Sequence, residues 1–489
     1  MSRRPPVSTP KAVGGIVGAL FFVELVSGML QGYYTPLMTD IARNLDIHDA
    51  DVNWFEAAQL LVSAMLVPVL SKLGDLYGHR RLLVVAAVVT AVATWGVAFA
   101  PGFSSYLVFW AAQGIFTVWL PLEVALIHIR SAREADPAAT TRRATGIIVA
   151  ALQAGAILGA LSAGLFSSVF DDNLVLVLSV PAVATTAVVV VILRWVPDAH
   201  EPHSHGSVDL VGAALLSTSL LLVVGGLMLI RVDGLASPWP WLAFVLGLAL
   251  LVPFARQERR HDDPLIDLEV MRQPSMWPVQ LTALLFGVSI LGAQIPLSTY
   301  ARTDPDEYGY GLGLSAGGVA PVIGLYVLSL LVGAALFARV SAALTPRRTL
   351  IGAAALVGIG YLGLLLLHGS LAEVVVCMAT AGVGSGALVA ALPAAAASAA
   401  PPGGTAVATG LTNTTKTLGG AFASSVFALA LASGVTADSD DTAAPLHGYL
   451  TVWAICGVTA LVAALCLVFV PRGAFSHADP APATPEEHV

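Results

Sequence analysis

Carboxyl side chains inside long apolar runs are the residues of this sequence best suited to chemistry. Glu24 lies in the middle of the run 12–34, and Glu123 lies near the end of the run 105–128. An ionisable group in such surroundings is costly and usually faces a cavity or a partner. Burial favours the uncharged form of a carboxyl group, which is what a proton carrier needs near neutral pH. We therefore predict proton coupling at Glu24 and Glu123; the alternative for Glu24 is a polar contact that locks helices together.

Other polar or aromatic groups in the apolar runs could face a small molecule. Lys416 is a cation that could neutralise a buried acid or attract an anionic group. Amide side chains offer hydrogen bonds without the cost of a charge, although bonding between helices is an equal alternative. The predicted residues of a substrate cavity are Gln31, Gln59, Trp110, Gln113, Gln153, Gln294, Asn413 and Lys416.

Membrane-spanning helices have to position these side chains. The chain of 489 residues is 57% hydrophobic and only 11% charged, and its mean hydropathy is +0.82. This balance indicates an all-α polytopic membrane protein rather than a soluble one. About fourteen runs approach the ~20 residues that a bilayer span needs. They lie near 12–34, 53–70, 82–100, 105–128, 144–166, 174–196, 209–230, 239–255, 276–300, 316–340, 349–368, 371–394, 405–433 and 447–470.

Polar connectors divide these spans into a six-plus-two-plus-six arrangement. Lysine and arginine gather in the segments that lie inside if both termini are cytoplasmic, as the positive-inside rule requires. Only three cations fall on the outside, namely Arg43, Arg231 and Arg302. The predicted parts are a tail 1–11, a six-helix bundle 12–196, a connector with two inserted helices 197–255, a connector 256–275, a second six-helix bundle 276–470 and a disordered tail 471–489.

The loop 71–81 between the second and third spans carries the most specific pattern. Its glycines permit a tight turn with positive φ. Its acid could cap the next helix or pair with an arginine, and its arginines suit a cytoplasmic loop. The pattern G-D-x-x-G-x-R-R is formed by Gly74, Asp75, Gly78, Arg80 and Arg81. A weaker copy, T-P-R-R at 345–348, opens a later span and indicates an internal repeat.

This loop resembles the signature of major facilitator superfamily transporters, in which it acts as a conformational latch on the cytoplasmic side. The span layout is similar to that of the fourteen-span drug:proton antiporters of this superfamily. Three further segments resemble that family, namely E-R-R-H-D-D-P-L-I-D at 258–267, Y-G-Y-G-L-G-L-S at 308–315 and the glycine-rich stretch 409–420.

Two spans depart from the family's pattern. The family's fourth span usually carries R-x-x-Q-G, with the arginine tied to proton transfer, whereas Trp110 holds the arginine position here and Gln113 and Gly114 match. The family's fifth span carries G-P-x-x-G-G, but Ala160 replaces the proline and Ala163 replaces one glycine. Small residues still allow close helix packing.

The resemblance implies a major facilitator fold in the cell membrane and secondary active export of small apolar or amphipathic compounds, such as drugs or antibiotics. It implies proton antiport with alternating access. Uptake of a small metabolite, proton-coupled or facilitated, is the alternative because Trp110 and Ala160 replace antiporter residues. A non-transporting membrane sensor is disfavoured because no sizeable soluble segment is visible. The expected partners are a small-molecule substrate, protons and lipid, with no nucleic acid, and we expect a monomer.

Patterns for other chemistry are missing from the sequence. There is no G-x-x-x-x-G-K-[ST] loop for a nucleotide and no catalytic nucleophile or helical H-E-x-x-H motif in a credible context. The cysteines all fall in apolar runs, which argues against disulfides and zinc, and the histidines of one connector fit a solvated linker better than a metal site. These residues are Cys377, Cys456, Cys466, His200, His203 and His205. We expect no enzymatic activity, metal or cofactor.

Overall fold

The computed structural model describes residues 11–131, 134, 136–171, 173–197, 207–261, 264–291, 294–399, 405–434 and 442–470. These residues form long helices and contain no strand, which confirms the all-helical prediction. The tails up to residue 10 and from residue 471 lie outside the described residues, and so does the histidine-rich stretch around His203.

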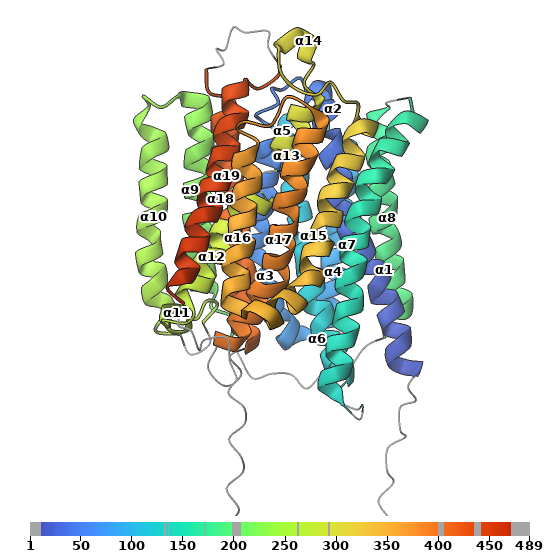
Figure 1. Cartoon of the computed structure of the whole chain (residues 1–489). Coiled ribbons are helices and arrows are strands. Elements are labelled where there is room, and N and C mark those ends of the chain that lie inside the picture. The colour runs from blue at the N-terminus through green and yellow to red at the C-terminus, as the bar shows by residue number, and fades with distance from the viewer. Residues whose placement is uncertain are drawn as a thin grey trace, which may run out of the picture.

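The first six predicted spans correspond to one set of helices, which we call the first helix group (Figure 1). α1 (Lys11–Tyr33) is followed by the short η1 (Thr35–Leu37) and α2 (Met38–Asn44). The fourth predicted span consists of three consecutive segments, α5, η2 and α6. The remaining bounds are α3 (Asn53–Tyr77), α4 (His79–Ala98), α5 (Phe103–Gln113), η2 (Gly114–Val118), α6 (Trp119–Ser131), α7 (Pro137–Val169) and α8 (Leu174–Trp195).

The other predicted spans also correspond to helices. α9 (Leu210–Asp233) and α10 (Pro238–Glu258) form a hairpin, which we call the inserted hairpin, and α11 (Leu268–Arg272) follows it. The second helix group comprises α12 (Trp277–Leu291), α13 (Gln294–Arg302), α14 (Pro305–Tyr308), α15 (Ala316–Leu344), α16 (Pro346–Gly363), α17 (Leu371–Ala399), α18 (Thr405–Leu431) and α19 (Leu446–Val468).

Twelve stretches of the described chain are long and apolar enough to cross a membrane. α16 and α18 occupy the positions of the two other predicted spans but are not among the twelve. α16 begins with Pro346, Arg347 and Arg348, and α18 contains Asn413 and Lys416, so both are more polar than their neighbours. The count of fourteen spans therefore stays a prediction.

Polar side chains cap the start of several helices, where backbone N–H groups have no partner in the helix itself. Asn173 accepts from the N–H of Leu176 at the start of α8, and Asp209 accepts from the N–H of Gly212 at the start of α9. The sequence thus marks these helix starts locally.

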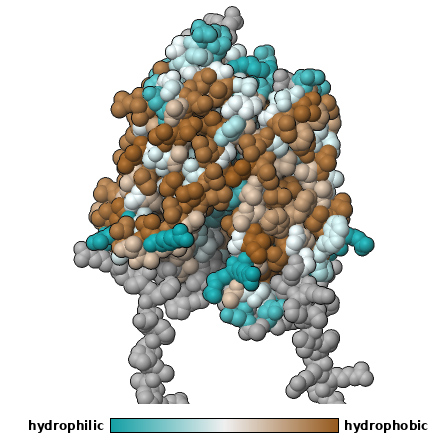
Figure 2. All heavy atoms as spheres, turned by 45° about the vertical axis from the view of Figure 1, so that its right-hand side comes forward, coloured by the Kyte–Doolittle hydropathy of each residue, from teal (hydrophilic) through white to brown (hydrophobic). Residues whose placement is uncertain are grey.

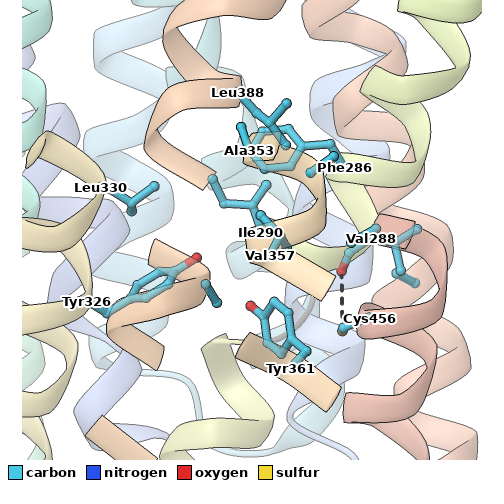
Figure 3. Packing of buried hydrophobic residues seen from close by; sticks show 14 of the residues in the cluster. Phe286, Val288, Ile290, Tyr326, Leu330, Ala353, Val357, Tyr361, Leu388 and Cys456 are labelled. Carbon is cyan, nitrogen blue, oxygen red and sulfur yellow. Dashed lines mark hydrogen bonds between the residues drawn. The ribbon is translucent and has the colours of Figure 1, made fainter. Parts of the chain in front are cut away.

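Two large apolar cores hold the helix groups together. One lies mainly among helices of the first group and the other mainly among helices of the second group. Figure 3 shows part of the second core, where Phe286 and Ile290 of α12 pack near Leu388 of α17. Tyr361 is labelled in the same view and is buried. Its hydroxyl group donates to the carbonyl of Ser289 at 2.7 Å.

The inserted hairpin lies at one side of the molecule, with α10 outermost (Figure 1). α9 packs on α3 of the first helix group and on α18 of the second. Trp54 and Ala57 of α3, Leu227 of α9 and Ala428 of α18 share one small core. The hairpin therefore covers the seam at which α3 and α18 meet.

The outer surface is apolar around the middle of the molecule. Figure 2 shows hydrophobic residues over the middle of one face and hydrophilic residues gathered toward its two ends. Large apolar side chains such as Val92 on α4 and Val245 on α10 are exposed. In water such a surface would be costly, so it indicates contact with lipid.

Glycines allow two pairs of helices to touch backbone to backbone. A Cβ atom at Gly28 of α1 would lie 1.8 Å from the carbonyl oxygen of Leu152 on α7, and one at Gly155 would lie 2.0 Å from that of Leu25. α12 and α18 cross in the same way, because a Cβ at Gly287 would lie 2.0 Å from the carbonyl oxygen of Lys416. Only glycine fits at these crossings.

The internal repeat is visible in the backbone and in its hydrogen bonds. Gly78 and Thr345 occupy equivalent turns and have φ angles of 99° and 125°. The guanidinium group of Arg80 donates to the carbonyls of Leu193 and Val196 at the end of α8. Arg347 donates likewise to the carbonyls of Leu467 and Val468 at the end of α19. Each arginine satisfies carbonyls that a helix end leaves without partners.

The glycine crossing of α1 and α7 gives a direct test of this packing. We expect Gly28→Ala to destabilise the protein by about 3 kcal/mol, because the new methyl group overlaps a backbone carbonyl. Gly18→Ala is the matched control on the same helix, since nothing lies within 4 Å of that position. Thermal unfolding of both variants in detergent measures the difference. Equal stability of the two variants would contradict the crossing.

Candidate functional site

The two carboxyl groups predicted to carry protons are brought together inside the first helix group. Glu24 of α1 and Glu123 of α6 are each 0% exposed, and their charges lie close enough to interact. No hydrogen bond of normal geometry reaches any of their four carboxyl oxygens within the described part of the chain. Ser27, one turn further along α1, is the hydroxyl group that interacts with Glu24. This pair is the candidate site.

A break in the fourth span positions Glu123. The helix changes to a tighter 3₁₀ form at Gly114–Val118, between α5 and α6. A Cβ at Gly114 would lie 2.3 Å from the carbonyl oxygen of Gln59, so α3 touches the backbone here. Ser63 of α3 donates to the Gly114 carbonyl at 2.8 Å. Because a 3₁₀ turn has fewer residues than an α turn, the break changes which face of α6 points inward.

Trp110 belongs to a buried aromatic cluster. Its ring centroid is 4.6 Å from that of Tyr34 and 5.6 Å from that of Tyr106, and Phe55 of α3 lies 4.7 Å from Tyr106. Gln113 donates from its amide to the hydroxyl group of Tyr34 at 3.1 Å. Trp110 is only 2% exposed. Trp110 therefore packs as an apolar ring at the position where the drug:proton antiporter pattern has a charged arginine.

The other predicted cavity residues are more dispersed. They lie on α1, α3, α7, α13 and α18 and are at least partly exposed, unlike the acid pair: Gln31, Gln59, Gln153, Gln294, Asn413 and Lys416. The amide of Gln294, at the start of α13, donates to the carbonyl of Ile290 in the preceding helix α12 at 3.4 Å. Gln113 and Trp110 thus both contact Tyr34, whereas the other predicted cavity residues are spread over five helices.

The segment 71–81, predicted as a loop, is mostly helical, because α3 continues to Tyr77 and α4 begins at His79. Only Gly78 forms the turn between them. Gly78 has positive φ and is the residue before α4, and no side chain caps this helix start. Asp75 contacts the ring of His79 at 3.0 Å instead of capping α4. Gly74 packs against Leu122 of α6, the residue next to Glu123, because a Cβ there would lie 2.7 Å from the Leu122 side chain. Arg81 is exposed.

Sequence reasoning missed three participants, namely Tyr106, Phe55 and His79. Tyr106 stands four residues before Trp110 on one helix, and this spacing places the two rings on one face. His79 likewise stands four residues after Asp75. Phe55 had no local signal, because it lies on another helix.

Known proteins resemble this chain over much of its length. Residues 20–424 match the sequence profile of the Major Facilitator Superfamily. The probable actinorhodin transporter of Streptomyces coelicolor is 28% identical over 403 residues, which cover 79% of this chain and 66% of that protein. The tetracenomycin C resistance and export protein of Streptomyces glaucescens is 26% identical, over 59% of this chain and 54% of that protein. The matched region thus spans two thirds or less of these relatives.

Solved structures show a similar arrangement of helices. A mutant of the nucleoside transporter NupG superposes with a TM-score of 0.64 at 11% identity, over 93% of this chain and 99% of that chain. A mutant of the peptide transporter POT superposes with a TM-score of 0.66 at 15% identity, over 96% of each chain. At such identities the likeness concerns the fold alone.

The aromatic cluster predicts a large loss of stability when its central ring is removed. We expect Trp110→Ala to cost about 3–5 kcal/mol, because a fully packed indole leaves a cavity, and Trp110→Phe to cost less. Trp239→Ala is the control, since Trp239 on α10 is 67% exposed. Thermal stability followed by size-exclusion chromatography compares the three variants. A Trp110→Ala protein as stable as Trp239→Ala would contradict a packing role.

Proposed function

Because the chain belongs to the Major Facilitator Superfamily, we propose that it exports small apolar or amphipathic compounds of the drug or antibiotic type by proton antiport. The chain is an integral multi-pass membrane protein, and we place it in the plasma membrane as a monomer that performs transport rather than an enzymatic reaction. The relative named as a tetracenomycin C resistance and export protein supports this substrate class. The puromycin resistance protein pur8 of Streptomyces alboniger is another, 26% identical over 72% of this chain.

The pair of Glu24 and Glu123 is the observation that carries the proposal. A buried carboxylate without hydrogen-bond donors is unfavourable, and a proton removes its charge. Two such groups within electrostatic range cannot both ionise cheaply, so at least one of them holds a proton. When the site opens to water on one side, that proton can leave; when it opens on the other, a proton can return. If the proton and the substrate replace each other at the site each time it opens, the inward flux of protons and the outward flux of substrate would be coupled.

The remaining parts of the proposal concern the path of the substrate. The partly exposed amides and Lys416 would line a cavity between the helix groups, since Gln59 lies on α3 and Asn413 and Lys416 lie on α18, two helices that pack together. The loop 74–81 would stabilise one state, as a latch. Its bond from Arg80 to the end of α8 and its contact with α6 support that role.

The proposed architecture has fourteen spans in a six-plus-two-plus-six order, with both termini in the cytoplasm. The correspondence of each predicted span with a helix supports the count. The two separate apolar cores support the division into two bundles joined by the inserted hairpin. The scarcity of cations at the end that carries α2 and α14 supports the orientation.

Uptake is the second candidate function, either proton-coupled or facilitated. Trp110 favours it, because this residue is packed among aromatic rings and cannot take the part of the antiporter arginine. In a facilitator the acid pair would have a structural role, and substrate would cross without net proton movement.

Proteoliposomes with an imposed pH gradient and an internal pH-sensitive dye test the proposal. With ethidium as the probe, we expect wild type to couple ethidium movement to proton movement, and Glu24→Gln and Glu123→Gln each to reduce that proton movement at least tenfold. Glutamine keeps the shape of the side chain and removes its exchangeable proton. Glu373→Gln is the matched control, because Glu373 accepts a hydrogen bond from the N–H of Ser370 at the start of α17, far along the chain from the pair.

Two outcomes would contradict the proposal. Unchanged proton movement in both variants would remove the acid pair from the coupling site. Ethidium movement without any proton movement in wild type would favour the facilitator.

A further inference from the structure

The loop between α2 and α3 is the hub of an ion-pair network at one end of the molecule. Three arginines that sequence analysis placed alone on the outside each pair with an aspartate of this region. Arg43 contacts Asp49 at 3.0 Å and Arg231 contacts Asp51 at 3.0 Å. Arg302 of α13 pairs with Asp40 of α2.

These three pairs join different parts of the chain. The pair Arg43–Asp49 lies within the first helix group. The pair Arg231–Asp51 joins the inserted hairpin to the first helix group. The pair Arg302–Asp40 joins the second helix group to the first. We propose that Arg302–Asp40 is a gate contact that breaks when the two helix groups separate at this end, whereas Arg231–Asp51 is a permanent tether that makes the hairpin move with the first group.

Other contacts show that the two helix groups meet around the gate pair. The hydroxyl group of Ser298 donates to the carbonyl of Thr35 at 2.5 Å, and the backbone N–H of Asp49 donates to the carbonyl of Thr442 at 3.0 Å. α7 and α15 also touch here, since a Cβ at Gly164 would lie 2.9 Å from the Cα of Gly317. α2, α13 and α14 lie together at this end (Figure 1). The structure is therefore closed at the end that carries α2 and α14.

The gate pair has the partial exposure that a reversible contact needs. The side chains of Arg302 and Asp40 are 16% and 33% exposed, so water can solvate both charges once they part. Asp49 differs, because its side chain is 2% exposed. Burial raises the pKa of Asp49 to about 6, and the charges of Arg43 and Arg302 oppose that rise. Asp49 thus places a second acid within electrostatic range of Arg302.

Besides the tether Arg231–Asp51, further contacts join the inserted hairpin to the first helix group. At the same end, Leu227 and Ile230 of α9 pack with Trp54 and Ala57 of α3. At the opposite end, Lys72 of α3 donates to the carbonyl of Pro264, just after the hairpin, at 3.3 Å. Polar contacts at both ends therefore hold the hairpin to the first helix group.

The contact of the hairpin with the second helix group is of a different kind. α18 offers it the small side chains of Ala421 and Ala428 and the apolar Leu411. Smooth apolar contact of this kind can shift without breaking a bond, so α9 can slide over α18 when the groups separate.

Cross-linking distinguishes a gate from a tether. In a background without native cysteines (Cys377→Ala, Cys456→Ala, Cys466→Ala), the double variants Asp40→Cys/Arg302→Cys and Asp51→Cys/Arg231→Cys are linked with a short bis-methanethiosulfonate. Linking the first pair is expected to reduce ethidium transport in proteoliposomes at least tenfold, reversibly with dithiothreitol. Linking the second pair is expected to change transport less than twofold. Full transport by the first linked variant, or equal loss in both, would overturn the proposal.

A distance measurement tests the gate without any substrate. Spin labels at Asn44 on α2 and Glu307 on α14, both exposed, report the separation of the two groups by double electron–electron resonance. Arg302→Ala is expected to add a population at longer distance, and Arg231→Ala is expected to leave the distribution unchanged. An unchanged distribution in Arg302→Ala would overturn the gate. Failure of the proposed export would instead appear as wild-type protein that does not move ethidium.

Discussion

Contact between helix backbones is the constraint on which the rest of the structure depends. α1 and α7 cross so closely that the carbonyl of Leu25 meets Gly155, and Gly28 meets the carbonyl of Leu152. Glu24 stands one turn before Gly28, so this crossing fixes the depth and direction of its carboxyl group. The crossing of α12 and α18 places Lys416 in the same manner, because its own carbonyl is the atom that Gly287 meets. Glu24 and Lys416 thus lie at helix crossings where the backbones are in direct contact and have little room to move.

The acid pair and the aromatic cluster differ in how their buried polar atoms are satisfied. Apolar surroundings make every polar atom costly unless it finds a partner. In the aromatic cluster, the Gln113 amide and the Tyr34 hydroxyl group are hydrogen-bonded to each other. The Trp110 ring packs against the Tyr34 ring. No hydrogen bond of normal geometry reaches Glu24 or Glu123 within the described residues, and the hydroxyl group of Ser27 interacts with Glu24 alone, so protonation would reduce the cost of burying them. The buried acid pair is held in place by well-packed surroundings.

The sequence predicted the helices, because apolar runs of span length are local signals. It also indicated Glu24 and Glu123 individually as candidate residues, and both are buried. Their proximity could not be predicted, since it depends on the 3₁₀ break after Gln113 and on the approach of Gly114 to α3. The order of the predicted spans placed Arg231 and Arg302 at the same end as the segment after the first span, yet their partners are 180 and 262 residues away. Pairing over such separations follows from packing.

The outermost helix of the hairpin would make the fit between this protein and the thickness of its bilayer matter. α10 has 21 residues. Only 17% of its most apolar 18-residue stretch is buried, so lipid rather than protein covers most of this helix. Its length of about 31 Å is close to the hydrocarbon thickness of a typical membrane. In a thinner or thicker bilayer, α10 would tilt or deform the lipid around it. Because the hairpin is fixed to Asp51 at one end and to Lys72 at the other, that hydrophobic mismatch would act as a mechanical load on the first helix group.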